Sequence, residues 1–193
     1  LHYGRCHGAP PWIPREGDRA GMRILLTAFV ACLLVMRGQS AFAQACLPFQ
    51  LTSPTGATGD DFAAASAAST DTIVIGIPGK KVGANSFQGQ AMVYRWNGAA
   101  WALEATLTAS DGAANDSFGC AVALSGDTAV IGAYSKASYQ GAAYVFTRSG
   151  SVWSQQAKLT ASDALPGDAF GYCVSISGNT VVTGAYAKPS GTN

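Results

Sequence analysis

The feature that most constrains this chain is an internal repeat marked by phenylalanine. Phe62, Phe118 and Phe170 recur at offsets of 56 and 52 residues, and the residues around them recur with them. In each copy a glycine stands 14 residues after the phenylalanine, at Gly76, Gly132 and Gly184. Repetition at a period of about 50 residues indicates structural units that stack in a row or are arranged around an axis.

Each of the two complete copies contains four short β-prone segments separated by turn residues. Ser125-Gly126-Asp127 and Ser149-Gly150 are typical hairpin turns, so the segments on either side of each should pair. Four strands in a repeat of about 50 residues are typical of a β-propeller blade, and a stacked β-solenoid with shorter turns is the alternative. In the second copy the expected strands are 118–124, 128–134, 142–148 and 151–160.

The segments between the second and third expected strands are candidate ligand-binding loops. They cover residues 80–88 in the first copy and 136–140 in the second, and they differ in length and sequence. Loops held on a rigid scaffold commonly carry recognition, so we expect ligand contacts there. The candidate residues are Lys80, Lys81, Asn85, Lys136 and Tyr139.

Two paired motifs resemble those of FG-GAP repeats. Phe118-Gly119 is followed by Gly132-Ala133-Tyr134, and Phe170-Gly171 is followed by Gly184-Ala185-Tyr186. The first copy departs from the pattern at Phe62-Ala63, but its Gly76-Ile77-Pro78 keeps the final proline. The resemblance extends from about residue 49 to residue 193.

This resemblance implies a β-propeller that serves as a binding platform in a secreted or cell-surface protein, as in integrin alpha subunits. We therefore expect an all-β partial propeller that acts as an extracellular binding or adhesion module with a protein or glycan ligand. The alternative is that these blades form the non-catalytic propeller portion of a larger exported enzyme such as a hydrolase. Sequence beyond Asn193 would distinguish the two, because a fold alone does not fix a function.

The calcium loop of integrin-like repeats is reduced to a tight turn here. Those repeats often carry an Asp-x-Asp-x-Asp-Gly loop, because calcium prefers six to eight oxygen ligands. The corresponding Ser125-Gly126-Asp127 and Ser177-Gly178-Asn179 each offer one acidic or amide side chain. We expect no cofactor, with calcium as the open alternative. Turn and capping roles are favoured over metal binding for a second acidic set, Asp111, Asp116, Asp163 and Asp168.

No catalytic constellation is found after residue 43. The two histidines, His2 and His7, precede that point, which leaves no histidine for a catalytic triad or a metal site. Trp101 and Trp153 occupy the same repeat position, which favours packing, with sugar stacking as the alternative. We expect a protein that is not an enzyme.

The N-terminal region has the pattern of a secretory signal peptide. Met22 and Arg23 precede an apolar run over 24–36, and Ala41-Phe42-Ala43 predicts cleavage before Gln44. A membrane anchor is the alternative, but crossing a bilayer takes about 20 apolar residues. We expect residues 1–21 to be a non-native leader, 22–43 a signal peptide, and the mature chain to be secreted or surface-bound with no membrane span.

The remaining charge and cysteine content sets further limits. After residue 43 the chain has seven basic and nine acidic residues and no basic stripe, so no nucleic-acid partner is expected. The same region contains three cysteines, Cys46, Cys120 and Cys173. Because three is an odd number, they define no disulfide framework. The expected units are 44–106, 107–158 and a truncated third over 159–193, which we expect to be too few to close a ring and therefore prone to association.

Overall fold

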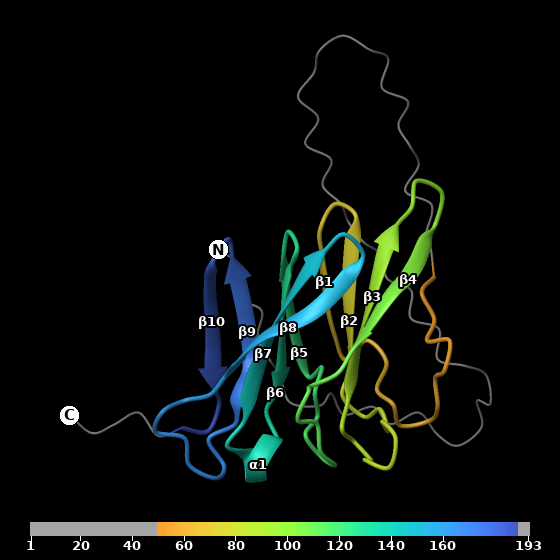
Figure 1. Ribbon diagram of the computed structural model, residues 1–193. Coiled ribbons are helices and arrows are strands. Elements are labelled where there is room, and N and C mark those ends of the chain that lie inside the picture. The colour runs from red at the N-terminus through yellow and green to blue at the C-terminus, as the bar shows by residue number, and fades with distance from the viewer. Residues whose placement is uncertain (1–49, 189–193) are drawn as a thin grey trace. The chain divides into compact units, whose positions relative to one another are not determined.

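The computed structural model describes residues 50–188, which form two four-stranded sheets and a hairpin (Figure 1). The first sheet holds β1 (Ala65–Ala68), β2 (Thr72–Ile77), β3 (Gln90–Trp96) and β4 (Trp101–Leu107). The second holds β5 (Ala121–Ser125), β6 (Thr128–Ala133), β7 (Ala142–Ser149) and β8 (Val152–Leu159). The hairpin is β9 (Phe170–Ser177) and β10 (Thr180–Ala185), and the short α1 (Lys136–Tyr139) lies between β6 and β7.

Each sheet is an antiparallel meander in which sequential strands are neighbours. This topology confirms the four-stranded repeat and rules out a stacked solenoid for residues 50–188, because solenoid coils pair in parallel across repeats. The turns within hairpins lie at one end of the sheets, which we call the hairpin end. The β2–β3 and β6–β7 connections and those between units lie at the opposite end, the loop end (Figure 1).

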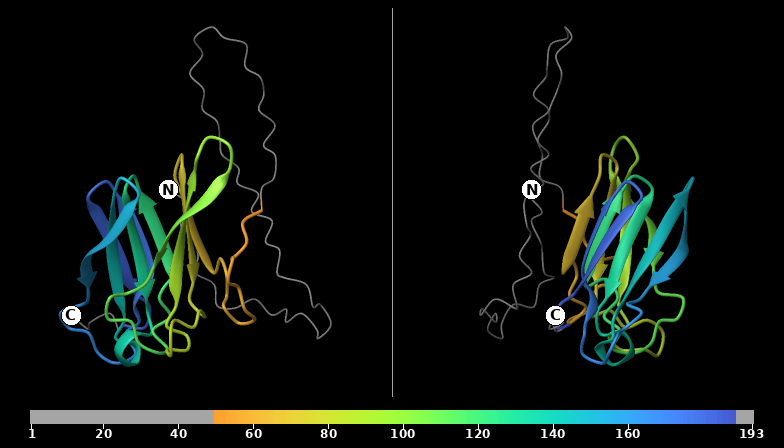
Figure 2. Two further views of the ribbon diagram at one scale, coloured as in Figure 1. Left: turned by 45° about the vertical axis from the view of Figure 1, so that its right-hand side comes forward. Right: turned by 90° about the vertical axis from the view of Figure 1, so that its left-hand side faces the viewer.

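The first strand of each unit lies next to the first strand of the following unit. β1 contacts β5, and β5 in turn contacts β9 (Figure 2). These strands are rich in small residues, such as Ala65, Ala67, Ala121 and Ala123, which allow neighbouring backbones to approach closely. Inner strands grouped in this way are the arrangement of a propeller around its axis, so the predicted partial propeller is confirmed.

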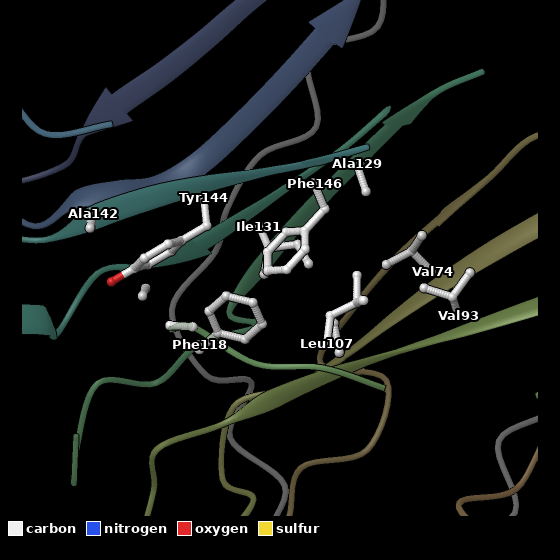
Figure 3. Close-up of a cluster of buried hydrophobic side chains, with 12 residues drawn as sticks. Val74, Val93, Leu107, Phe118, Ala129, Ile131, Ala142, Tyr144 and Phe146 are labelled. Atoms are coloured by element: carbon white, nitrogen blue, oxygen red, sulfur yellow. The ribbon is translucent and has the colours of Figure 1, made fainter. Parts of the chain in front are cut away.

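The core between the two sheets is built around Phe118 (Figure 3). The Phe118 side chain is fully buried. Its ring centroid lies 5.5 Å from that of Tyr144 and 6.0 Å from that of Phe146. The first sheet supplies Val74 and Leu107 to the same cluster. Burying one phenylalanine side chain stabilises a fold by about 1.5–3 kcal/mol, so this residue contributes directly to the cohesion of the two units.

The glycine of the Phe-Gly pair in one unit packs against the glycine that stands 14 residues after the phenylalanine of the preceding unit. A Cβ at Gly132 would lie 2.0 Å from the carbonyl oxygen of Gly171 in the next unit. In the preceding pair of units, a Cβ at Gly76 would lie 1.9 Å from the carbonyl oxygen of Gly119. Real Cβ atoms do not approach an oxygen so closely, and only glycine permits this backbone contact.

The predicted start of the second unit's first strand is wrong by three residues. β5 begins at Ala121 rather than at Phe118. Phe118 instead forms a parallel bridge with Gly89 of the preceding unit, and its backbone N–H donates to the carbonyl oxygen of Gln88 at 2.9 Å. The Phe-Gly pair therefore belongs to the interface with the preceding sheet. Neither Cys120 nor Cys173 forms a disulfide within residues 50–188.

We predict that Gly132→Ala destabilises the protein by about 3 kcal/mol, because the added methyl group meets backbone that cannot move aside. The matched control is Gly126→Ala, at a turn residue with φ of +55° and no atom within 4 Å of the built Cβ. This control should cost only the left-handed backbone penalty of about 1 kcal/mol. Urea unfolding of both variants measures the difference, and equal costs would contradict the close contact between units.

Candidate functional site

The loop end consists of connections from adjacent units that are joined by backbone hydrogen bonds. The N–H groups of Ser117 and Phe118 donate to the carbonyl oxygens of Phe87 and Gln88 at 3.0 and 2.9 Å. The next pair of units repeats this pattern, with Ala169 donating to Tyr139 at 2.7 Å and Phe170 donating to Gln140 at 3.1 Å. The loops at this end are therefore fixed to the neighbouring unit.

A lysine holds the connection that enters the second unit in place. Lys136 Nζ lies 2.8 Å from Asp116 Oδ2 and also donates to the backbone carbonyl of Asp111. The same Asp116 oxygen accepts the backbone N–H of Ala113 at 2.7 Å. The Lys136 and Asp116 side chains are only 10% and 5% exposed. We call this arrangement the lysine clamp.

The lysine clamp recurs in all three units at the offsets of the sequence repeat. Lys80 Nζ lies 2.8 Å from Asp60 Oδ2 and donates to the carbonyl oxygen of Thr55. Lys188 Nζ lies 3.0 Å from Asp168 Oδ2 and donates to the carbonyl oxygen of Asp163 at 2.7 Å. Hydrogen bonds from the Leu165 backbone and then from Lys188 lower the pKa of Asp168. The clamp is thus part of the repeated scaffold.

The four acidic residues considered for metal binding are occupied by protein groups. Asp116 and Asp168 each accept a hydrogen bond from a lysine ammonium and another from a backbone N–H. Asp163 pairs with Lys188 at 3.0 Å. The ammonium lies where a cation bound by these carboxylates would lie. No group of three or more His, Cys, Asp or Glu side chains forms a potential metal site within residues 50–188.

Asp111 links the loop end to the core. Its carboxylate accepts hydrogen bonds of 2.7 Å from both Tyr144 Oη and Lys158 Nζ. Burial alone would raise the pKa of Asp111, but the bonds from Lys158 and Tyr144 and the charge of Lys136 outweigh it and lower the pKa to about 2. Burial, followed by the bond to Asp111, raises the pKa of Tyr144. Asp111 therefore stays ionised over the whole neutral and mildly acidic range.

Two aromatic residues are exposed at equivalent positions of adjacent units. Phe87 and Tyr139 lie 52 residues apart, and their side chains are 52% and 53% exposed. Both adopt left-handed backbone conformations, with φ of 54° and 65°. Left-handed φ is uncommon for bulky residues. Their carbonyl oxygens accept the hydrogen bonds that fix the loops, so the same backbone conformation both joins the units and leaves the rings in solvent.

The five predicted loop residues divide into two groups. Lys80 and Lys136 are held in lysine clamps, and Asn85 donates to Gln88 Oε1 at 2.8 Å and to the carbonyl oxygen of Gly112 at 3.3 Å. Lys81 and Tyr139 are exposed. Sequence reasoning missed Phe87 and the clamp role of the lysines, although the offsets of 56 and 52 align Lys80, Lys136 and Lys188.

A polar network joins the first two units at the hairpin end. The buried Glu104 carboxylate accepts the Trp153 indole N–H at 2.9 Å and the Arg148 guanidinium at 3.3 Å. Arg148 also lies over the Trp153 ring, 5.4 Å from its centroid. An open cavity of about 660 Å³ beside this network is lined by residues that include Arg95 and Asp127. Trp153 therefore packs between units, as predicted, and its indole is already hydrogen-bonded.

We predict that Lys136→Met destabilises the protein by about 3 kcal/mol, because it leaves the buried Asp116 carboxylate without its counter-charge. Lys81→Met is the matched control at an exposed lysine and should change stability by less than about 0.5 kcal/mol. Adding Asp116→Asn to Lys136→Met should recover part of the loss, because the uncompensated charge is removed. Thermal and urea unfolding measure all three. A Lys136→Met variant as stable as the control would contradict the clamp.

Comparison with known proteins agrees with this architecture. The FG-GAP repeat family model matches residues 101–146 and 153–193. A search of curated proteins found no match. Within residues 50–188, no helix has the length and apolar content needed to cross a bilayer. The matched segments contain the last strands of one unit and the Phe-Gly and Gly-Ala-Tyr motifs of the next, so the chain is an FG-GAP repeat protein.

Proposed function

We propose that this FG-GAP repeat protein is an exported binding or adhesion module whose ligand contacts the loop end. FG-GAP repeats are typical of extracellular and cell-surface proteins, which supports an extracytoplasmic location. The signal-peptide pattern at 22–43 supports export as well, and it lies outside the described residues. The ligand is a protein or a glycan.

The exposed pair Phe87 and Tyr139 is the observation on which this proposal rests. Each left-handed non-glycine residue costs about 1–2 kcal/mol, and each exposed ring forgoes the stabilisation of burial. Backbone strain of this kind concentrates at functional sites. Aromatic side chains are also enriched among the residues that dominate binding energy. Two such rings on adjacent units form a ligand surface better than they form a packing element.

The rigidity of the loop end favours recognition. Backbone hydrogen bonds and lysine clamps hold the loops that carry both rings, so a ligand would order few additional groups on binding. A pre-organised surface binds more tightly because less conformational entropy is lost. The loop end is therefore suited to hold a partner in a fixed orientation.

We also propose that the loop end is non-catalytic. A general acid needs a pKa near the working pH, which usually requires a carboxyl in an apolar site. The loop-end carboxylates Asp60, Asp116 and Asp168 are paired with lysine, and the pKa of Asp111 is lowered to about 2. These groups are suited to hold loops rather than to transfer protons.

The test is to probe protein and glycan arrays with the full chain and with a Phe87→Ser/Tyr139→Ser double variant. The double variant should bind its array ligand about tenfold more weakly or worse, because it removes both aromatic anchors. Val152→Ser is the control, since Val152 is 67% exposed at the hairpin end and should not affect binding. Unchanged binding by the double variant, or loss of binding in the control, would contradict a ligand site at the loop end.

A further inference from the structure

Tyrosine replaces the final proline of the GAP motif in two of the three units. Tyr134 and Tyr186 occupy the position that Pro78 holds in the first unit. They lie in contact with two further tyrosines, Tyr139 of α1 and Tyr172 of β9. The ring centroids are 5.9 Å apart for Tyr139 and Tyr134, 5.6 Å for Tyr134 and Tyr172, and 4.8 Å for Tyr172 and Tyr186. We call these four residues the tyrosine row.

The tyrosine row offers both ring surface and hydroxyl groups to solvent. Tyr139 and Tyr186 are 53% and 74% exposed, and Tyr134 is partly buried between units. The hydroxyls of Tyr134, Tyr139 and Tyr186 make no hydrogen bond with any part of residues 50–188. These three phenols can each donate and accept a hydrogen bond, so they offer polar groups beside apolar rings.

The surface around the tyrosine row carries little free charge. Lys136 and Lys188 each follow a tyrosine of the row by two residues, but both ammonium groups are held in clamps by Asp116 and Asp168. A ligand that depends on charge would find no unpaired partner among these side chains. The row therefore favours a neutral ligand.

We propose that the tyrosine row binds a neutral carbohydrate, an inference that rests on the proposed function and names its ligand class. Sugar rings have apolar C–H faces that stack on aromatic rings and hydroxyl edges that hydrogen-bond to phenols. A proline-rich peptide would instead need an aromatic-lined groove. Tyr134 and Tyr172 pack edge to face, with an interplanar angle of 77°, rather than as the parallel walls of a groove.

The test is calorimetric titration of the full chain with cellohexaose, laminarihexaose, xylohexaose and mannohexaose, and with decaproline as the peptide probe. At least one hexasaccharide should bind with Kd below about 1 mM, and decaproline should not bind. Tyr134→Ala and Tyr186→Ala should weaken that binding about tenfold or more. Tyr134→Phe keeps the ring and tests the hydroxyl alone without risk to folding, and it should weaken binding a few-fold. Val152→Ala at the hairpin end should leave the affinity unchanged.

The carbohydrate site would be overturned if no hexasaccharide binds or if binding survives every tyrosine variant. Binding of decaproline in place of the sugars would also overturn it. If an array ligand depends on Phe87 and Tyr139 but no sugar binds, the carbohydrate inference is contradicted. The proposed function would still be supported in that case. Loss of array binding in the Val152→Ser control would contradict the proposed function independently of the sugars.

Discussion

The structure depends on one contact, the meeting of two glycine backbones across adjacent units. Gly119 lies against Gly76, and Gly171 lies against Gly132, at distances that leave no room for a Cβ. Phe118, which precedes Gly119, lies outside β5 and fills the space between the two sheets. The Phe-Gly and Gly-Ala-Tyr motifs are therefore two sides of one interface, and the repeat describes how units join as much as how each one folds.

The loop end follows from this contact. Once Phe118 bridges Gly89, the β2–β3 connection of one unit lies beside the connection that enters the next. The lysine clamp then neutralises the aspartate that turns the chain, and the connecting hydrogen bonds select a left-handed conformation at Phe87 and Tyr139. The exposed rings on which the proposed function rests are thus a consequence of how the units are joined.

The repeat spacing was sufficient to predict the strands, the sheets and the partial propeller, because alternating and turn-forming residues act locally. The start of β5 could not be predicted, since the bonding partner of Phe118 lies in another unit. The position of Lys80 and Lys136 in variable loops suggested ligand contact, but loop position alone does not reveal whether a counter-charge lies beside each lysine. Phe87 was missed because left-handed φ and solvent exposure depend on contacts between units rather than on residue type.

Hydrogen exchange in the native state measures the coupling between units most directly. The Phe118 amide bonds to the Gln88 carbonyl oxygen of the preceding unit, whereas Val130 belongs to the central β6 of its own sheet. If the glycine contact joins the units into one cooperative structure, both amides should exchange only through global unfolding and show similar protection. Exchange of the Phe118 and Phe170 amides at rates typical of open loops, with Val130 still protected, would show that the units open independently and would contradict this account.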